Sequence, residues 1–556
     1  MNENTQSLSS VSSVSSLIYE FSRLDISGER LERYSTEANT LISSTKENEL
    51  RTKAKFLRNE AISIILNDIK LSMKVDLCFV LDCTGSMWPH IAAARGCILQ
   101  VANYIKNTNP SIEFRVGFCG YRDHNDGSNR LQIFDFNDQY DQFTKYMHNI
   151  LPFSSPEDDD APEDVLGGLN AAITQMDWKN STRVLLHICD SPPHGRHFSN
   201  LKDKYPDGDP YGLTEKIVLE KMKSKNILYF FGKITRHTEK MLEAFRGIIG
   251  EFPVFDLASE DPIKLIEKFV KATSSSIAYA VSLTSVIGSN SKEIYSSRRR
   301  KLDMNPNEPD WNTLPIQKGV VLWYSTPKSL NELVDPTYFG KSNLFYESFL
   351  FKIAHEPFSA GAEKYAYFAR EIKNEPTKEI VIKEYLNLGE RNNPIEKYLE
   401  MVEVSTVTSF LSTEFNFYAE QKNISKISFL DVKLLRCNTI DVRARCFAIE
   451  PKLRIAEYKR FNTNTGVITE FRSTLEAFVH FTYNYTEGYL VVCDLQGIEL
   501  NNEFLLTDPA IHCIDPLRFG KTNFGEKGIK QLFLENHRCN EICKKLNLSD
   551  IHMNYY

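Results

Sequence analysis

FVHFTYNYTEGYLVVCDLQGIELNNEFLLTDPAIHC (478–513) and FGKTNFGEKGIKQLFLENHRCNEICKKL (519–546) are the two stretches that decide the fold of this chain. The first stretch carries carboxylate and amide oxygens at Asp494, Gln496 and Asp508, and oxygen is the ligand atom that Mg²⁺ prefers. The second stretch opens on a loop rich in glycine that leads into an amphipathic helical pattern. Oxygen ligands beside such a loop indicate phosphate chemistry.

The second stretch ends on the pattern H-x-C-x3-C, formed by His537, Cys539 and Cys543. Imidazole and thiolate at this spacing are typical zinc ligands. A zinc ion held by four protein ligands has no open position for a substrate, so the pattern predicts a structural zinc site. It also predicts a separate magnesium site at the carboxylates, because hard oxygen ligands suit Mg²⁺ and thiolates do not.

Length, charge and cysteine content narrow the class of protein. A chain of 556 residues exceeds a single hydrophobic core, so two or more domains are expected. The net charge of −7 makes nucleic acid an unfavoured partner. The sequence contains neither a run of about 18 apolar residues nor the pattern of a secretory signal. Eleven cysteines, an odd number, favour free thiols in a reducing compartment. We therefore expect a cytoplasmic protein without a transmembrane segment, with attachment to a membrane surface or the cytoskeleton left open.

Changes in composition divide the chain into five predicted segments. They are a disordered Ser-rich tail (1–16), a helical segment (17–73), an α/β domain (74–275), a polar linker (276–314) and a second domain of mixed helices and strands (315–550). For the helical segment, packing on a neighbouring domain and self-association as a coiled coil are alternative interpretations.

The α/β domain is predicted from six apolar runs of strand length, beginning with VDLCFVLD (75–82). Helical patterns separate nearly all of these runs. Strands that alternate with helices in this way predict a doubly wound, mostly parallel sheet. In such sheets, ligands bind beyond the carboxyl ends of the strands.

Oxygen-bearing side chains lie where that rule places a ligand. Asp82, Thr84 and Ser86 follow the first strand at alternate positions, so an extended loop can point all three in one direction. Asp190 closes a later strand, and an acidic loop lies between at 156–164. A divalent cation would suit this set. The alternative is a helix N-cap followed by a turn.

The α/β domain resembles a von Willebrand factor type A (vWFA) domain. The segments VDLCFVLDCTGSM (75–87), YRDH (121–124), DAPEDVLGGL (160–169) and HICDSPPHG (187–195) follow the motifs of that family in order. The resemblance implies a metal-ion-dependent adhesion site (MIDAS) that recruits a protein ligand. Its cation ligands would be Asp82, Thr84, Ser86 and Asp190, with Asp160 assigned as the ligand from the middle loop.

Two strand-like segments of the second domain carry further candidates. EIVIKEY (379–385) places Lys383 among apolar residues, where a lysine usually points to solvent. CFAIEP (446–451) reads as a strand that leaves for a connector, where Glu450 would meet a nucleotide base. A plain surface glutamate is the alternative there. A hairpin at 357–371, with Gly361 near its centre, is either a phosphate-covering loop or an ordinary β-turn.

The second domain resembles the alpha-kinase family of atypical protein kinases, in particular the myosin-heavy-chain-kinase-like group that carries a vWFA domain. LVVCDLQG (490–497), LLTDPAIH (505–512), FGKTNFGEKGI (519–529) and HRCNEIC (537–543) follow its carboxyl-terminal motifs, and VIKEY (381–385) and FAIEP (447–451) fit its earlier ones. A chance match to all of these motifs together is improbable.

The resemblance implies a role for each residue. Lys383 would contact the nucleotide phosphates, and Glu450 would face the adenine. Asp494, Gln496 and Asp508 would hold Mg²⁺, with Asp508 the principal ligand and Asp494 the candidate base near the attacking hydroxyl. The opposite division of labour between the two aspartates stays open. Further ATP contacts are assigned to Gly361, Lys364, Gln496, Gly520, Asn523 and Gly525.

Two further implications concern the hairpin and the zinc site. Lys364 stands where the family usually has arginine, and an ammonium cannot form the two-pronged contact that a guanidinium makes with phosphate. The fourth zinc ligand implied by the resemblance is His480. A histidine that is hydrogen-bonded within the core is the alternative for that residue.

The sequence thus predicts an ATP- and Mg²⁺-dependent protein kinase that phosphorylates Ser or Thr in a protein substrate. Its cofactors would be Mg²⁺ and a structural Zn²⁺, and its vWFA domain would recruit a protein partner. The alternative is an adaptor with a weakly active or inactive kinase fold that acts mainly through the vWFA domain.

Overall fold

A computed structural model describes residues 44–154, 160–287, 304–360, 364–372, 378–385, 394–438, 444–453, 457–549 and 551. The chain forms two compact units. The α/β unit comprises residues 67–300 and 467–469, and the C-terminal unit comprises residues 1–66, 301–466 and 470–556. The predicted tail at 1–16 and residues 288–303 of the predicted linker (276–314) lie outside the described residues. Among the described residues, no helix is both long and apolar enough to cross a membrane.

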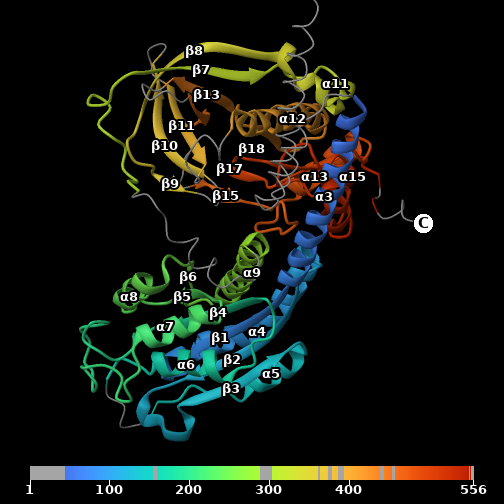
Figure 1. Cartoon of the computed structure of the whole chain (residues 1–556). Helices are drawn as coiled ribbons and strands as arrows, with labels where there is room; N and C mark the ends of the chain where they lie inside the picture. Colours follow the sequence, from blue (N-terminus) through green and yellow to red (C-terminus); the bar gives the residue numbers. More distant parts are fainter. Residues whose placement is uncertain are drawn as a thin grey trace, which may run out of the picture. The chain divides into compact units, whose positions relative to one another are not determined.

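The α/β unit is built on a six-stranded sheet in the order β3-β2-β1-β4-β5-β6 (Figure 1). All neighbouring strands are parallel except β2 and β3, which are antiparallel. The predicted doubly wound, mostly parallel sheet is therefore confirmed. The strands are β1 (Lys74–Asp82), β2 (Glu113–Tyr121), β3 (Leu131–Asn137), β4 (Thr182–Cys189), β5 (Ile227–Lys233) and β6 (Val254–Asp256). The central strands are buried along nearly their whole length, which explains why they read as continuous apolar runs.

Two groups of helices flank this sheet. One group places α4 against α5 and α9, and the other places α7 against α6 and α8. Their bounds are α4 (Trp88–Thr108), α5 (Tyr140–His148), α6 (Val165–Gln175), α7 (Glu215–Ser224), α8 (Glu239–Ile249) and α9 (Pro262–Ile287). Short 3₁₀ turns, Gly85–Met87 and His124–Asn129, follow β1 and β2. Helix α9 runs past residue 275, where the sequence had placed the end of the domain.

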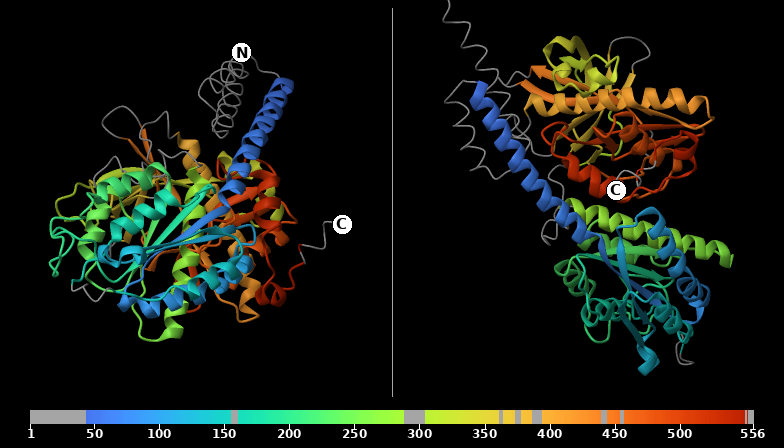
Figure 2. Two further views of the ribbon diagram at one scale, coloured as in Figure 1. Left: turned by 90° about the horizontal axis from the view of Figure 1, so that it is seen from below. Right: turned by 90° about the vertical axis from the view of Figure 1, so that its right-hand side faces the viewer.

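Helix α3 (Ser44–Ser72) is one continuous helix (Figure 2). Its residues up to Leu66 belong to the C-terminal unit and its last six to the α/β unit. Apolar side chains of the C-terminal-unit part, such as Leu50, Ala54 and Ile62, are buried. The predicted helix is thus present over the described residues, and it packs within its own chain. The structure leaves self-association untested.

The first half of the C-terminal unit is a seven-stranded sheet in the order β11-β14-β13-β7-β8-β10-β9. Because β11 also pairs with β10, the sheet closes on itself. The strands are β7 (Gln317–Tyr324), β8 (Leu344–Ile353), β9 (Ser359–Ala360), β10 (Lys364–Glu371), β11 (Lys378–Tyr385), β13 (Lys433–Asn438) and β14 (Ala444–Pro451). A short helix, α11 (Leu330–Val334), and two 3₁₀ turns (Pro336–Phe339 and Lys341–Asn343) join β7 to β8.

The second half combines two small sheets with helices. One sheet has the order β12-β18-β17-β15, and the other pairs β16 with β19. The strands are β12 (Lys426–Phe429), β15 (Lys459–Arg460), β16 (Leu490–Cys493), β17 (Gln496–Leu500), β18 (Glu503–Thr507) and β19 (Ala510–Cys513). The helices are α13 (Ser473–Tyr485), α14 (Gly525–Gly528), a π-helical stretch (Ile529–Leu534) and α15 (Glu541–Lys545).

The long helix α12 (Ile395–Glu420) joins the two halves of the C-terminal unit. It contacts β7, β13 and β14 of the large sheet as well as β12 and α13 of the second half (Figure 2). Its apolar side chains lie in a buried cluster that includes side chains from both halves. This shared core fixes the strands that carry the candidate site residues.

Candidate functional site

Lys383 lies at the centre of a partly buried ionic cluster in the C-terminal unit. It stands on β11 opposite Ala366 of β10 and Ala448 of β14. These small neighbours leave room on the same face of the sheet for the long side chain. Lys383 Nζ lies 2.6 Å from Glu450 Oε1 and also pairs with Asp508 Oδ2. The side chain therefore points into the protein, and the solvent-facing alternative is wrong.

The charges of this cluster stabilise one another. Burial disfavours the charged ammonium of Lys383, but the carboxylates of Asp508 and Glu450 raise its pKa above the usual value. Burial likewise opposes ionisation of Asp508, but the ammonium groups of Lys364 and Lys383 lower its pKa well below the usual value. Lys364 Nζ lies 3.1 Å from Asp508 Oδ1. Asp508 is therefore a permanent carboxylate with a cation on each oxygen.

Glu450 is not the surface glutamate of the alternative interpretation. Its side chain is buried, one carboxylate oxygen pairs with Lys383, and the other accepts a 2.6 Å hydrogen bond from Thr507 Oγ1. With both oxygens engaged, the side chain fixes Lys383. Contact of Glu450 with an adenine stays a prediction.

Asp494 and Asp508 share an uncommon backbone conformation. Their φ angles are 56° and 48°, in the left-handed region that few residues other than glycine adopt. Such conformations cluster at functional sites, where the surrounding structure enforces them. Asp494 follows β16 and Asp508 follows β18, so each strand end carries one carboxylate.

Arg460 of β15 holds Asp494. Its Nη2 and Nε atoms lie 2.6 Å and 2.8 Å from Asp494 Oδ1. Burial raises the pKa of Asp494 to about 6, with Asp508 acting in the same direction and Arg460 against it. Arg460 was not predictable from the sequence, because β15 is only two residues long and pairs with β17 far along the chain.

Gln496 and Asn523 have their side-chain amides engaged within the protein. Gln496 Nε2 donates to the Asp508 carbonyl at 3.2 Å, and its Oε1 accepts from Tyr458 at 3.0 Å. Asn523 Oδ1 accepts from the backbone N–H groups of Cys513 and Gly525, and its Nδ2 donates to two carbonyl oxygens. Asn523 therefore shapes the loop at 520–525 from within.

The same loop depends on its glycines and on helix α3. Gly520 has a φ of 80°, and a Cβ there would lie 1.5 Å from Glu400 Oε1. Gly525 also has a positive φ, of 65°. Arg58 of α3, which is 1% exposed, donates to the carbonyl oxygens of Lys521 at 2.8 Å and Asn523 at 2.7 Å. No local pattern in the sequence indicates the role of Arg58, which lies more than 460 residues from the loop. Gly361 of the predicted hairpin lies outside the described residues.

The four predicted zinc ligands come together. One ligand atom from each of His480, His537, Cys539 and Cys543 lies within 4.8 Å of all the others. Cys539 Sγ lies 3.7 Å from His480 Nδ1, and Cys543 Sγ lies 3.6 Å from His537 Nε2. Nitrogen and sulfur bound tetrahedrally to one zinc are about 3.6 Å apart, given the usual bond lengths. The geometry and the donor set therefore fit zinc. His480 lies on helix α13.

The α/β unit brings Asp82 and Asp190 together. Asp82 Oδ1 accepts hydrogen bonds from the backbone N–H of Thr84 at 2.9 Å and from its hydroxyl at 2.7 Å. Asp82 Oδ2 and Asp190 Oδ1 are buried and have no hydrogen-bond partner. Burial, together with Asp190, raises the pKa of Asp82 to about 7. Ser86 is exposed in the following 3₁₀ turn. Two buried carboxylate oxygens without partners fit a cation site.

Asp160, the predicted ligand from the middle loop, lies in a different cluster. Its Oδ2 accepts from the backbone N–H of Lys204 at 2.7 Å and lies 3.8 Å from His194 Nδ1. The acidic loop at 156–164 holds several carboxylates, so its sequence alone does not single out one of them.

Comparisons with known proteins agree with the motifs of the C-terminal unit. Residues 359–543 match the model of the alpha-kinase family. Over 529 residues the chain is 32% identical to alpha-protein kinase vwkA of Dictyostelium discoideum, covering 92% of this chain and 82% of that protein. It is 30% identical to myosin heavy chain kinase B of the same organism over 203 residues, which are 36% of this chain and 26% of that kinase.

Among solved structures, an alpha kinase from Entamoeba histolytica is similar at 29% identity, with a TM-score of 0.36, over 44% of this chain and 94% of that one. The long match to vwkA spans both units of this chain, and the family model covers the strands and loops that carry Lys383, Asp494 and Asp508. The chain belongs to the alpha-kinase family of protein kinases.

Proposed function

We propose that this protein transfers the terminal phosphoryl group of ATP, with Mg²⁺, to Ser or Thr residues of a protein substrate. The observation that carries the proposal is the ionic cluster of Lys383, Asp508 and the buried Glu450. Withdrawing these charges from most of their water is costly unless they serve one another or a ligand. Phosphoryl transfer needs this kind of arrangement, because its catalysis depends on positioning and on neutralising charge.

The two aspartates suit different tasks. Asp508, ionised at any physiological pH, suits the role of principal Mg²⁺ ligand. Asp494, with a pKa raised to about 6, is the better proton acceptor, because a general base works best when its pKa approaches the working pH. Gln496 would complete the oxygen ligands. When bound, Mg²⁺ would neutralise charge on the phosphates.

Lys383 and Lys364 are the proposed phosphate contacts. Both ammonium groups form ion pairs with the Asp508 carboxylate. They are therefore close to where the phosphate oxygens would lie if Asp508 binds Mg²⁺. Lys364 acts as a point charge, where an arginine would form a fork. The loop at 520–525, with Gly520, Asn523 and Gly525, would contact nucleotide or peptide through its backbone.

Phosphorylation of a test protein with labelled ATP and Mg²⁺ checks this proposal. Wild type should incorporate label into phosphoserine or phosphothreonine, and the rate of incorporation by Asp508→Ala should be at least about 100-fold lower. Asp431→Ala, which removes an exposed aspartate of the same unit, should incorporate label at the wild-type rate. Equal low incorporation by wild type and Asp508→Ala would favour the adaptor, in which the kinase fold only binds.

We also propose that His480, His537, Cys539 and Cys543 bind a structural Zn²⁺. The four residues tie α13 to the segment that ends in α15, and no ligand position remains for a substrate. Purified protein should contain zinc that Cys543→Ser removes, as measured by elemental analysis. Zinc content that this substitution leaves unchanged would contradict the assignment.

The α/β unit is proposed to be a vWFA domain that binds a protein partner through a cation held by Asp82, Thr84, Ser86 and Asp190. The buried carboxylate oxygens of Asp82 and Asp190 support this site. Asp190→Ala should abolish Mg²⁺-dependent capture of a partner while leaving phosphorylation of a small peptide unchanged.

We also propose that the protein is located in the cytoplasm.

A further inference from the structure

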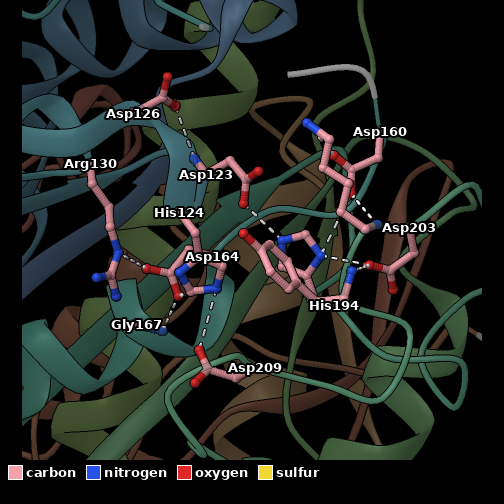
Figure 3. Close-up of polar contacts among 12 residues, drawn as sticks. Asp123, His124, Asp126, Arg130, Asp160, Asp164, Gly167, His194, Asp203 and Asp209 are labelled. Atoms are coloured by element: carbon pink, nitrogen blue, oxygen red, sulfur yellow. Dashed lines mark hydrogen bonds and ion pairs between the residues drawn. The ribbon is translucent and has the colours of Figure 1, made fainter. Parts of the chain in front are cut away.

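A second polar cluster lies in the α/β unit, apart from the residues assigned to the cation site (Figure 3). Two histidines, His124 and His194, stack with their ring centroids 5.3 Å apart. Buried carboxylates surround both rings. They belong to Asp123, Asp160, Asp164, Asp203 and Asp209. These residues come from loops that are separate in sequence, after β2, before α6 and between β4 and α7.

Both ring nitrogens of His194 have hydrogen-bond partners. Its Nε2 lies 2.8 Å from Asp123 Oδ1, and its Nδ1 lies 2.8 Å from Asp203 Oδ1. Its side chain is 2% exposed. An imidazole with a carboxylate at hydrogen-bond distance from each nitrogen is a local structural link, and it needs no further ligand.

His124 differs from His194 in this respect. Its side chain is also 2% exposed, but neither ring nitrogen has a hydrogen-bond partner. The nearest carboxylate oxygens to its Nε2 are Asp209 Oδ2 at 3.4 Å and Asp164 Oδ1 at 3.7 Å (Figure 3). Asp209 Oδ2 is itself buried and without a partner. Leaving buried polar groups unpaired is unfavourable, so a ligand for them is expected.

These separations are those of ligands around a shared metal. Nitrogen and oxygen atoms bound tetrahedrally to one zinc ion are about 3.4 Å apart, given the usual bond lengths. The ligand atoms of His124, Asp164 and Asp209 all lie within 4.8 Å of one another.

The two carboxylates are also held in place by their remaining contacts. Arg130 Nε pairs with Asp164 Oδ2, and Asp164 Oδ1 accepts from the N–H of Gly167 at 2.9 Å. Asp209 Oδ1 accepts from the N–H groups of Tyr211 at 2.8 Å and Leu213 at 3.0 Å. This leaves Asp209 Oδ2 directed at His124. Hydrogen bonds that orient the ligands from behind are characteristic of protein metal sites.

We propose that His124, Asp164 and Asp209 bind a divalent transition metal, with Zn²⁺ the best fit. An imidazole ligand selects zinc and similar ions over Mg²⁺ and Ca²⁺. The site therefore differs in chemistry from the all-oxygen set at Asp82 and Asp190, and in ligands from the thiolate site of the C-terminal unit. The proposal goes beyond the kinase function and does not depend on it.

The metal would fasten a long irregular segment. Between β4 and α7, residues 191–214 form no helix or strand apart from one isolated bridge at Pro193. Asp209 lies in this segment, whereas His124 and Asp164 lie in the loops after β2 and before α6. A metal bound by all three would link these loops on the side of the sheet where a vWFA-type domain meets its partner.

Cobalt binding to the full-length protein tests the proposal. Metal-free protein is loaded with Co²⁺ in excess Mg²⁺, so that Mg²⁺ occupies the all-oxygen sites. Cobalt bound by Cys539 and Cys543 gives thiolate-to-metal absorption, and cobalt at the His124 site does not. Wild type should bind one equivalent of cobalt more than its thiolate absorption accounts for. The absence of that additional equivalent in wild type would overturn the proposal without any variant.

Substitutions then locate the additional equivalent. His124→Gln and Asp209→Asn should each lose it while the thiolate absorption is unchanged. His197→Gln, which alters a half-exposed histidine of the same segment, should retain it. Cobalt content unchanged in both ligand variants would contradict the assignment. If the thiolate absorption is absent in wild type and in every variant, the proposed zinc site of the C-terminal unit is refuted. The cobalt content of the His124 and Asp209 variants still tests the site in the α/β unit.

Discussion

At the scale of single residues, Lys383 shows why a charged side chain stands within an apolar strand. Its neighbours across the strands are alanines, and its ammonium lies between two carboxylates that come from distant strands. A buried lysine with two acidic partners is stable only as a set, because removing any member leaves an unbalanced charge in the interior.

Replacing Lys383 by Met should therefore abolish catalysis. The substitution keeps the length of the side chain but removes the cation that would contact the phosphates. We expect kcat/KM for ATP to fall by at least about 100-fold, as loss of a preorganised electrostatic contact usually does. Lys378→Met, at the exposed start of the same strand, should stay within about twofold. Circular dichroism distinguishes lost chemistry from lost fold, and a folded Lys383→Met enzyme with more than a tenth of the activity would refute the assigned role.

Glu476 predicts a pH dependence of stability. Burial raises its pKa to about 7, although a hydrogen bond from Asn462 opposes the shift. Because the pKa of Glu476 is raised in the folded state, its neutral carboxyl group stabilises the fold fully below pH 4.5. This stabilisation is lost as the pH rises through 7. The difference amounts to about 3 kcal/mol. Glu476→Gln, which never ionises, should match wild type at pH 4.5 and exceed it at pH 8.

Urea unfolding at the two pH values measures this effect. The control is Glu526→Gln, since Glu526 is exposed in the same unit. The control should show no pH-dependent difference from wild type. Identical curves for wild type and Glu476→Gln at pH 8 would mean that the carboxyl group is not buried as a neutral acid.

At the scale of elements, helix α3 acts as a support for the loop at 520–525. Arg58 supplies hydrogen bonds to two carbonyl oxygens, and Lys55 and Arg51 lie 3.4 Å and 3.3 Å from the carboxylate of Asp515 just before the loop. The helix therefore fixes the loop through two of its carbonyl oxygens, and Asn523 fixes it through its side-chain amide.

Arg58→Met should weaken this support. It leaves the buried carbonyl oxygen of Asn523 and the part-buried carbonyl oxygen of Lys521 without their charged donor, a loss of about 2–4 kcal/mol in the free energy of unfolding. Amide hydrogen exchange in residues 520–525 should accelerate. Glu60→Gln, on the exposed side of the same helix, should change neither measurement. Unchanged exchange in Arg58→Met would show that the loop keeps its shape without the helix.

Particular elements show how far the sequence predicts this structure. The strands of the α/β unit were recognisable because continuous apolar runs are what a doubly covered parallel sheet requires. That His480 joins His537, Cys539 and Cys543 could be predicted only with the help of family resemblance, since His480 lies 57 residues before its nearest partner in sequence. Arg58, Arg460 and the true partner of Glu450 were not predictable, because their roles depend on contacts between distant segments that no local pattern records.

At the scale of the whole molecule, the C-terminal unit is discontinuous in sequence. It takes its first part from residues 1–66 and resumes at residue 301. The family match at 359–543 therefore marks only part of what folds together. Arg58 and the buried apolar residues of α3 contribute to this unit from outside the matched region.

A fragment comprising residues 301–556 should consequently be less stable than the complete chain. Adding a synthetic peptide of residues 44–66 should raise its thermal unfolding midpoint by several degrees, roughly 2–4 °C for each kcal/mol that is restored. A peptide with Arg58→Met should restore less. If the fragment unfolds at the same temperature with and without the wild-type peptide, α3 is not part of the folding unit.

Helix α3 also bears on how this enzyme could have been assembled. The α/β unit interrupts the sequence of the C-terminal unit, so removing the α/β unit requires a new connection between residues 66 and 301. Recombination that transfers only residues 359–543 would omit helix α3, and the recipient would have to replace the contacts that this helix makes.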